Sequence, residues 1–334
     1  MLFEDLTQLY GPSGYETPVR EFIKDYIGDG ADQITTDALG DLIVFREGTG
    51  EHKKRIMSCA HMDEIGLQVT KINEDGTISI KSLGYPFFYT TYQRRVLFKN
   101  GTVGIIECKT NMSEANNDFS KFYVDLGVTT KEEAEKYVEV GDTAVYIGEY
   151  HELGTPYVTA KAIDDRVGCY IQLKGMELAG RHPYNDMYYV FTVQEELGTR
   201  GSHVTAPRIK PDLGIAVDVT PSHDRPADMQ GSNTPGKGTA IKVSDTSVIC
   251  DEYLVEKQVE LCKANGIPYQ KDVIYVGGTD ASSINLANEG ARACGISVVT
   301  RYTHGPNCIV NMDDVEASWK LLAAMANAEY EFEV

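Results

Sequence analysis

The feature that most constrains this chain is an apolar, β-prone run at residues 187–193 that leads into two adjacent carboxylates, Glu195 and Glu196. A glycine-punctuated turn follows at 198–201. Such a run is typical of a buried parallel strand that ends at a site. Neighbouring side chains of a strand point to opposite faces, so both carboxylates reach one cavity only where the backbone turns. One could then hold a metal ion and the other a water molecule, although a solvated glutamate pair in a loop is the commoner arrangement.

Length and composition limit the number of domains and the kinds of partner, but they do not indicate a substrate. A chain of 334 residues is long for one core, so we expect a main domain and a second one. The net charge of -19 argues against nucleic acid and anionic membranes as partners, because both are polyanions. Seven cysteines without paired short spacing suit reduced thiols packed in a core. No apolar run is long enough to span a bilayer, and residues 1–6 lack the pattern of a signal peptide, so we expect a cytoplasmic protein.

The pattern of expected secondary structure changes twice along the chain, which predicts an inserted domain. Helices and buried strands alternate before residue 68 and again after residue 158, whereas the stretch between them consists of short strands and turns. Asn-Gly at Asn100-Gly101 is the strongest hairpin signal in that stretch. We therefore predict an α/β fold with a mixed, largely parallel sheet flanked by helices, divided into a main domain of 1–67 and 159–334 and a small β-rich domain of 68–158.

Individual elements follow from periodicity, caps and turn residues. In the main domain we expect strands at 33–38, 42–46, 56–60, 187–193, 213–217 and 296–300, and helices at 2–10, 17–27, directly after 164–165, at 251–265, after 277–280 and from 313 onward. In the inserted domain we expect strands at 96–98, 103–108, 122–126 and 143–147, a short helix at 131–137, and a mobile polar loop at 111–121. Asp313 and Glu316 have the spacing of a capping box at the start of the last helix.

Residues able to bind metals follow the buried strands. Expected strands finish at His61, at the Glu195-Glu196 pair, at Asp218 and at His304, and one helix begins at Asp164-Asp165. The carboxyl ends of parallel strands line one crevice, so these side chains should converge. Imidazole and carboxylate ligands without thiolates suit catalytic zinc, cobalt or manganese, whose ligand preferences overlap. Two such ions need a shared ligand, and Asp164 is the candidate for that bridge.

The paired glutamates then take different roles. Two divalent ions lower the pKa of a bound water, and a glutamate that is not itself a ligand can take the proton before the water attacks a carbonyl group. A lone histidine is more often an ordinary polar residue than a ligand. The histidines left in that class are His52, His151, His182, His203 and His223.

Six segments together resemble the M42 family of dinuclear metallo-aminopeptidases, which includes glutamyl, leucyl and tetrahedral aminopeptidases. Each segment alone is a weak signal, but all six occur in order across most of the chain, with a β-rich insert between the first two. The matching segments are residues 60–66, 162–168, 194–201, 216–220, 277–281 and 301–304. The resemblance implies a zinc-peptidase-like catalytic domain.

The resemblance also implies roles for single residues. His61 and Asp218 would bind one metal ion, Glu196 and His304 the other, and Asp164 would bridge the two ions. Glu195 would be the general base, and Asp63 would either orient His61 or tune the site without binding a metal ion. The bond between Asp164 and Asp165 would be a non-proline cis peptide.

Partners and assembly are implied in the same way. Two divalent ions per subunit, Zn²⁺ or Co²⁺ or else Mn²⁺, would act on short peptides with a free N-terminus. The β insert would mediate assembly into dimers and tetrahedral dodecamers. Residues 305–308 differ from the usual family pattern, so the resemblance implies nothing about the substrate pocket at these residues.

Two other functions are compatible with parts of the sequence. Paired carboxylates also serve glycoside hydrolases such as cellulases, but those enzymes place the two groups on either side of a sugar and rarely use histidine ligands. A catalytically idle assembly protein that uses the β insert as its interface is the other alternative. Loss of activity on chelation, or any metal-dependent peptide cleavage, would separate these alternatives from an aminopeptidase.

Overall fold

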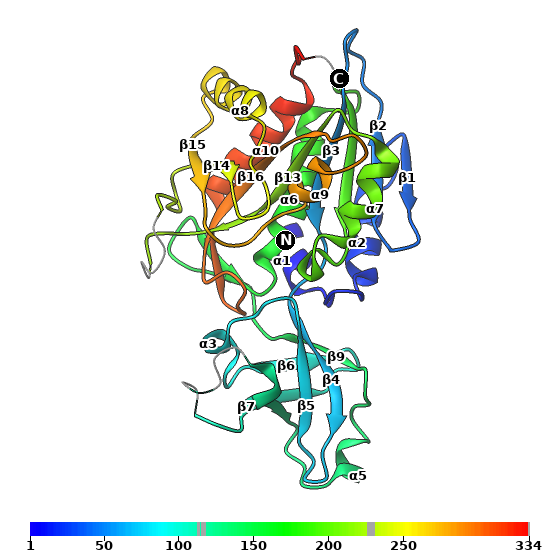
Figure 1. The fold of residues 1–334 in the computed structure, drawn as a ribbon, viewed down its shortest axis with the longest axis vertical. Coiled ribbons are helices and arrows are strands. Elements are labelled where there is room, and N and C mark those ends of the chain that lie inside the picture. Colours follow the sequence, from blue (N-terminus) through cyan, green and yellow to red (C-terminus); the bar gives the residue numbers. More distant parts are fainter. Residues whose placement is uncertain (112–113, 115–117, 226–230, 333–334) are drawn as a thin grey trace.

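A computed structural model describes residues 1–111, 114, 118–225 and 231–332. It consists of a large α/β domain and a smaller β-barrel that hangs from one end of it (Figure 1). The predicted loop at 111–121 lies partly outside the described residues. None of the helices in the described part of the chain is long and apolar enough to cross a membrane.

The large domain is built on one sheet of 11 strands, in the order β1-β2-β12-β3-β13-β16-β17-β11-β10, with β14 and β15 attached beside β16. The central pairs β12–β3, β3–β13 and β13–β16 are parallel, and the outer pairs along this path are antiparallel. The mixed, largely parallel sheet predicted from the sequence is thus confirmed. Its strands are β1 Gln33–Thr36, β2 Leu42–Arg46, β3 Arg55–His61, β10 His151–Glu152, β11 Tyr157–Ala160, β12 Asp186–Thr192, β13 Leu213–Pro221, β14 Thr239–Ser244, β15 Tyr269–Val273, β16 Arg292–Arg301 and β17 Cys308–Asn311.

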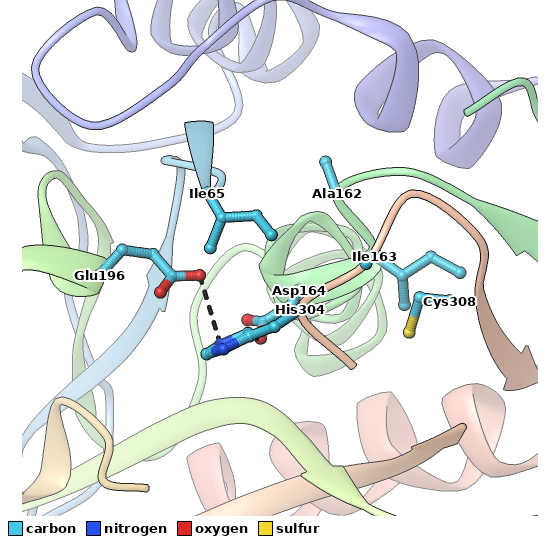
Figure 2. Close-up of a pocket in the computed structure, with 8 residues that line it drawn as sticks. Ile65, Ala162, Ile163, Asp164, Glu196, His304 and Cys308 are labelled. Carbon is cyan, nitrogen blue, oxygen red and sulfur yellow. Dashed lines mark ion pairs between the residues drawn. The ribbon is translucent and has the colours of Figure 1, made fainter. Parts of the chain in front are cut away.

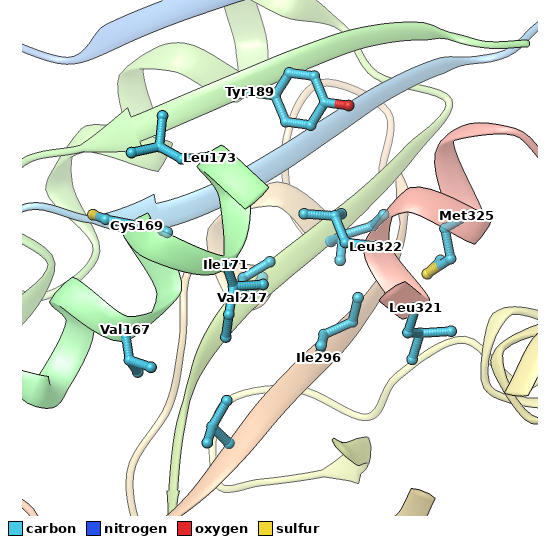
Figure 3. Packing of buried hydrophobic residues seen from close by; sticks show 14 of the residues in the cluster. Val167, Cys169, Ile171, Leu173, Tyr189, Val217, Ile296, Leu321, Leu322 and Met325 are labelled. Atoms are coloured by element: carbon cyan, nitrogen blue, oxygen red, sulfur yellow. The ribbon is translucent and has the colours of Figure 1, made fainter. Parts of the chain in front are cut away.

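Helices cover both faces of this sheet, because its central strands are apolar on both sides. They are α1 Leu2–Gln8, α2 Thr17–Ile27, α6 Ile163–Ala179, α7 Arg200–Ile209, α8 Glu252–Asn265, α9 Ala281–Asn285 and α10 Met312–Ala326. The main core lies between the sheet and α2, α6, α8 and α10 (Figure 3), and a smaller core lies beneath α7 and α9. Helices α6 and α10 approach closely at Gly175, where an added Cβ would lie 2.9 Å from Leu322 Cδ2.

The cap predicted for the last helix is wrong. Asn311, the final residue of β17, is the N-cap of α10, and its side chain accepts hydrogen bonds from the backbone N–H groups of Asp313 and Asp314. The helix therefore starts before Asp313, which lies in the first turn, where an acidic side chain favours the positive end of the helix dipole. Asp313 and Asp314 are N-cap residue types as well, so the sequence alone does not single out Asn311 as the cap.

The smaller unit is a closed barrel with its own core, in the order β4-β5-β8-β7-β6-β9. The hairpin predicted at Asn100-Gly101 joins β6 to β7, and a turn at 73–76 joins β4 to β5. Its elements are β4 Gly66–Ile72, β5 Ile78–Leu83, α3 Phe88–Thr91, β6 Arg95–Phe98, β7 Val103–Cys108, η1 Phe119–Lys121, β8 Phe122–Asp125, α5 Lys131–Ala134 and β9 Thr143–Tyr146. The hairpin β10–β11, by contrast, pairs with β17 in the large sheet, so a division at residue 158 would cut through β11.

Candidate metal centre

The candidate ligands come from two strands, from a loop and a turn that follow two other strands, and from one helix of the large domain. His61 is the last residue of β3, Asp218 lies in β13, and His304 follows β16 in a loop. Asp164 is the second residue of α6, and Glu196 lies in a single turn, η2 Glu195–Leu197, just after β12. All five positions are at the same end of the parallel strands, as expected for a site built on an open sheet.

The structure brings these side chains into two clusters that share one residue. His61, Asp164 and Asp218 form the first cluster, and Asp164, Glu196 and His304 form the second. Within each cluster the potential ligand atoms lie within 4.8 Å of one another. The two carboxylate oxygens of Asp164 divide between them: Oδ1 is 3.0 Å from His61 Nε2, and Oδ2 is 3.2 Å from His304 Nε2. Two metal positions with one bridging carboxylate fit this arrangement.

The second cluster has the space and the unsatisfied oxygen that a metal ion requires. A cavity of about 10 Å³ lies beside Asp164, Glu196 and His304, with Ile65 and Cys308 on its apolar wall (Figure 2). Glu196 Oε1 is buried without a hydrogen-bond partner, 3.6 Å from His304 Nε2. A buried carboxylate oxygen without a partner is costly, and a divalent cation would compensate for it.

The backbone at the start of α6 turns the bridging residue toward both clusters. The peptide bond between Asp164 and Asp165 is cis, as the resemblance implied, and both residues depart from helical geometry. Asp165 then points back into the protein, where it accepts hydrogen bonds from the backbone N–H groups of His61 (3.1 Å) and Gly168 (3.0 Å). A Cβ on Gly168 would lie 2.2 Å from Asp165 Oδ2, so only glycine fits there. Asp165 thus ties β3 to α6, a role that the sequence did not predict.

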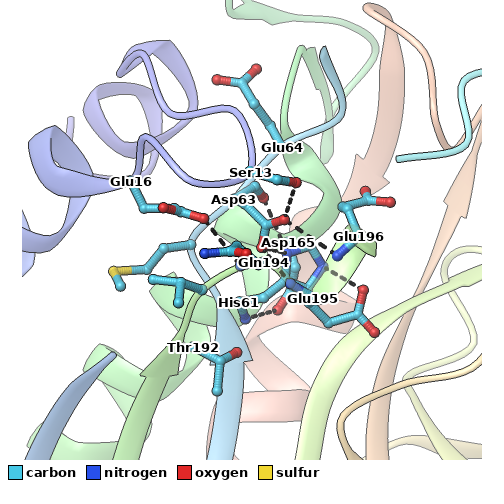
Figure 4. Close-up of polar contacts among 12 residues, drawn as sticks. Ser13, Glu16, His61, Asp63, Glu64, Asp165, Thr192, Gln194, Glu195 and Glu196 are labelled. Carbon is cyan, nitrogen blue, oxygen red and sulfur yellow. Dashed lines mark hydrogen bonds and ion pairs between the residues drawn. The ribbon is translucent and has the colours of Figure 1, made fainter. Parts of the chain in front are cut away.

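Asp63 organises the other side of the site (Figure 4). Its fully buried carboxylate accepts hydrogen bonds from the Ser13 hydroxyl (2.6 Å) and from the backbone N–H groups of Glu195 (3.0 Å) and Glu196 (3.3 Å). His61 Nδ1 lies 3.1 Å from the Asp63 carbonyl oxygen and 3.3 Å from its Oδ1. Because these oxygens can only accept, Nδ1 carries a proton, and Nε2, which faces Asp164, is the nitrogen that a metal ion could bind.

Glu195 stands beside the clusters without belonging to either. Its Oε2 is 4.0 Å from His61 Nε2, and its side chain keeps a small exposure to solvent of 12%. Burial raises the pKa of Glu195 well above its ordinary value. It thus lies next to His61, outside both ligand clusters, and is able to hold a proton.

Burial and neighbouring charges also shift the pKa values of the candidate ligands. Burial lowers the pKa of His304, but the carboxylates of Glu196 and Asp164 outweigh it and raise that pKa to about 10. Burial raises the pKa of Glu196 to about 7, and burial together with the charge of Asp164 raises the pKa of Asp218 to about 8. Burial would raise the pKa of Asp164 as well, yet hydrogen bonds from His304 and His61 hold it below its usual range. These shifts show that acidic groups are crowded together in a buried place, where a cation would be favoured.

One expectation about the strands is corrected here. Asp218 does not end its strand, because β13 continues to Pro221 in register with β16. The pairing of β13 with β3, however, stops at Ala216. Beyond that point the β3 side of β13 is free, so Asp218 reaches the site from within a strand that is still paired on its other side.

The barrel supplies a part of the site that sequence reasoning missed. His304 Nδ1 lies 3.1 Å from the carbonyl oxygen of Tyr85, and the hydroxyl of Thr90 donates to the carbonyl oxygen of His304 (3.1 Å). The ring of Phe87 lies 6.0 Å from the imidazole of His304. The available signal was the unusual aromatic run at 85–89, interrupted by a proline, inside a predicted β domain.

Comparison with known proteins gives a consistent result. The family model described as M42 glutamyl aminopeptidase matches residues 40–321. A putative aminopeptidase of Acetivibrio thermocellus is 40% identical over 96% of both chains, and a lysyl aminopeptidase of Pyrococcus furiosus is 30% identical over 97% of this chain and 95% of the relative.

Solved structures agree with these relatives. An aminopeptidase of the archaeon Desulfurococcus kamchatkensis superimposes with a TM-score of 0.92 at 35% identity, covering 98% of this chain and 94% of that one. The TET1 peptidase of Pyrococcus horikoshii, described as assembling into a tetrahedron or a large octahedral shell, superimposes with a TM-score of 0.85 at 31% identity, covering 97% and 98%.

Proposed function

Because this chain belongs to the M42 glutamyl aminopeptidase family and is a peptide hydrolase, we propose that it is a dinuclear, metal-dependent aminopeptidase that removes N-terminal residues from short peptides. The observation that carries the proposal is the position of Asp164, whose two carboxylate oxygens face His61 and His304 in two adjoining ligand clusters. A histidine in each ligand cluster argues against a glycosidase, and membership of a peptidase family argues against an idle assembly protein.

The proposed ligands are His61 and Asp218 for one ion and Glu196 and His304 for the other, with Asp164 shared. Zinc and cobalt are the first candidates and manganese the third, since imidazole and carboxylate ligands suit all three. When bound, such ions polarise a peptide carbonyl and lower the pKa of water.

Two further residues would move and orient protons. Glu195 is proposed as the general base, which takes a proton from the attacking water at a carboxylate oxygen and passes it to the leaving amine. Its place next to His61, outside both clusters, supports this role. Asp63 is proposed to act indirectly, by fixing the tautomer of His61 and by holding the backbone of Glu195 and Glu196.

Assembly and location complete the proposal. Related peptidases form closed shells, so we propose a homo-oligomer between a dimer and a tetrahedral dodecamer, with the inserted domain of 68–158 as the interface. In such a shell only short peptides would reach the site. A cytoplasmic location is supported by seven unpaired cysteines, of which all but Cys108 are buried.

The test is hydrolysis of aminoacyl-p-nitroanilides by chelator-stripped protein, with zinc, cobalt or manganese added back, alongside Glu195→Gln. We expect metal to restore cleavage, and the substitution to lower kcat by at least about 100-fold while both ions stay bound. Glu152→Gln, at an exposed position of β10, is the matched control and should keep full activity. Cleavage that survives chelation, or a fully active Glu195→Gln, would refute the proposal.

A further inference from the structure

Residues 84–91, which connect β5 to β6 and include α3, form what we call the aromatic segment. It belongs to the barrel in sequence but lies at the end of the barrel that faces the large domain (Figure 1). Three of its large side chains are exposed to solvent: Tyr85 by 77%, Phe87 by 36% and Tyr89 by 61%. The rings of Phe87 and Tyr89 are stacked, with centroids 5.3 Å apart. Exposed aromatic groups gathered in one place usually mark a surface that binds something.

The aromatic segment is in direct contact with the second ligand cluster. Tyr85 and Thr90 hydrogen-bond to His304, and the ring of Phe87 lies 6.0 Å from the His304 imidazole. At Gly84 an added Cβ would lie 3.0 Å from Glu196 Oε2. A substrate group held next to His304 would therefore lie beside the ring of Phe87.

Arg301, the last residue of β16 before the loop that carries His304, forms an ion pair with Asp224. Arg301 binds Asp224 through its Nε and through a second nitrogen at 2.5 Å, and its guanidinium also lies over the ring of Tyr157. The pKa of Asp224 is held low by this hydrogen bond, and that of Arg301 is raised by it. Neither group is therefore left to pair with a charged side chain of a substrate. Tyr302, the next residue after this pair, is 49% exposed and adds a further aromatic surface.

We propose that Phe87, flanked by Tyr85 and Tyr89, forms a specificity subsite that accepts an uncharged aromatic or large aliphatic side chain next to the scissile bond. This inference rests on the proposed aminopeptidase function and deepens it by naming the class of peptide. The barrel then contributes to substrate selection in addition to any role in assembly. Covering the exposed rings with an apolar side chain removes apolar surface from water, which favours such peptides over charged ones.

The experiment measures kcat/KM of the metal-loaded oligomer on leucyl-, phenylalanyl-, alanyl-, lysyl- and glutamyl-p-nitroanilide, and on the dipeptides Ala-Phe and Ala-Ala. The dipeptides report on the residue after the scissile bond, and the anilides on the residue before it. We expect the wild type to prefer the large uncharged side chain on one of these sides. Phe87→Ala should lower kcat/KM for that class by about 10- to 100-fold while changing the alanyl or Ala-Ala value less than about threefold.

Further variants separate binding from damage to the metal site. Tyr85→Ala removes an exposed ring but keeps the carbonyl oxygen that contacts His304, so it should reduce the same preference with unchanged metal content. Phe87→Leu should keep most of the preference. The control is Leu178→Ala, which removes a side chain of similar exposure, 57%, from the far end of α6, and it should change nothing.

The possible results test the subsite separately from the proposed aminopeptidase function. An active wild type that prefers lysyl or glutamyl substrates, or a uniform loss across all substrates in both Phe87→Ala and Tyr85→Ala, would overturn the subsite and leave the aminopeptidase standing. Absence of metal-dependent cleavage of every substrate would overturn both.

Discussion

Asp164 faces two histidines at once and acts together with Glu196 on the protonation of the site. The carboxylates of Glu196 and Asp164 outweigh the effect of burial and raise the pKa of His304 to about 10, well above neutral pH. Asp218, with a pKa of about 8, also holds a proton at pH 7. Metal ligands must be deprotonated, so ions have to displace these protons.

Metal binding should therefore be strongly pH-dependent. Below a pH of about 7 both groups are protonated and oppose metal binding; as the pH rises through 8 and toward 10 they lose their protons, so affinity rises. We expect the apparent affinity for zinc or cobalt to increase by up to about tenfold per pH unit for each proton displaced. Calorimetric titration in two buffers of different ionisation enthalpy measures the protons released.

A matched variant defines the baseline for that experiment. His151→Ala, at an exposed position of β10, should show the same pH dependence as the wild type. An affinity that stays constant between pH 6 and pH 9, with no proton release, would contradict the assignment of His304 and Asp218 as ligands.

The sequence predicted side chains better than it predicted the contacts of the backbone. Position beside strands and helix starts pointed to His61, Asp164, Asp218, His304 and the glutamate pair, the family resemblance chose Glu196 over Glu195 as a ligand, and the structure brings these side chains into two clusters. The support that Tyr85 gives to His304 comes from a carbonyl oxygen, which every residue carries. No sequence pattern can distinguish one carbonyl oxygen from another.

At the level of elements, buried strands with apolar runs were predicted within a few residues, because few side chains fit a sheet that is covered on both faces. Ends of elements were harder. The last helix begins after Asn311, which pairs with Tyr157 of β11, and β13 runs past Asp218 because it pairs with β16; both partner strands are far away in sequence. The residues near each boundary do not indicate which distant strand will pair there.

Arg166 holds several elements together around the site. It is fully buried, and its guanidinium lies 3.4 Å from Glu64 Oε1. It also donates hydrogen bonds to four backbone carbonyls, those of Leu6, Leu9, Gly11 and Met62. One side chain of α6 thereby fixes the end of α1, the turn before α2 and the segment that follows His61.

Loss of this guanidinium should destabilise the whole large domain. We expect Arg166→Met to lower the free energy of unfolding by about 3–5 kcal/mol, because the buried carbonyls lose their donor and Glu64 keeps only Lys161 as a partner. Urea denaturation followed by circular dichroism measures this change. Arg208→Met, at an exposed position of α7, should stay within about 0.5 kcal/mol of the wild type, and equal stability of the two variants would contradict the role given to Arg166.

At the level of the whole molecule, the barrel presents an apolar surface that a single copy leaves uncovered. Val103 and Ile105 lie two residues apart on β7, so they point to the same outer face, and they are 48% and 40% exposed. Tyr137 and Val140, also in the barrel part of the chain, are 48% and 63% exposed. Apolar surface of this kind is typical of an interface.

We expect Val103→Lys combined with Ile105→Lys to lower the molar mass of the assembly measured by light scattering, while the far-ultraviolet circular dichroism stays unchanged. The reason is that two cations replace apolar contacts at the proposed interface. Lys substitutions at Val273 and Ile249, which are exposed on the large domain, serve as the control and should keep the wild-type mass. The opposite pattern, with only the control pair dissociating, would place the interface on the large domain.

The strand order has a consequence for how the chain is made. Strand β3 lies between β12 and β13, so its two neighbours leave the ribosome only after about 130 and 160 further residues. All six strands of the barrel, in contrast, lie between Gly66 and Tyr146. During synthesis only the hairpin β1–β2 can pair before the barrel, and β3, which ends at His61, has no neighbouring strand to pair with until the second half of the chain has been made.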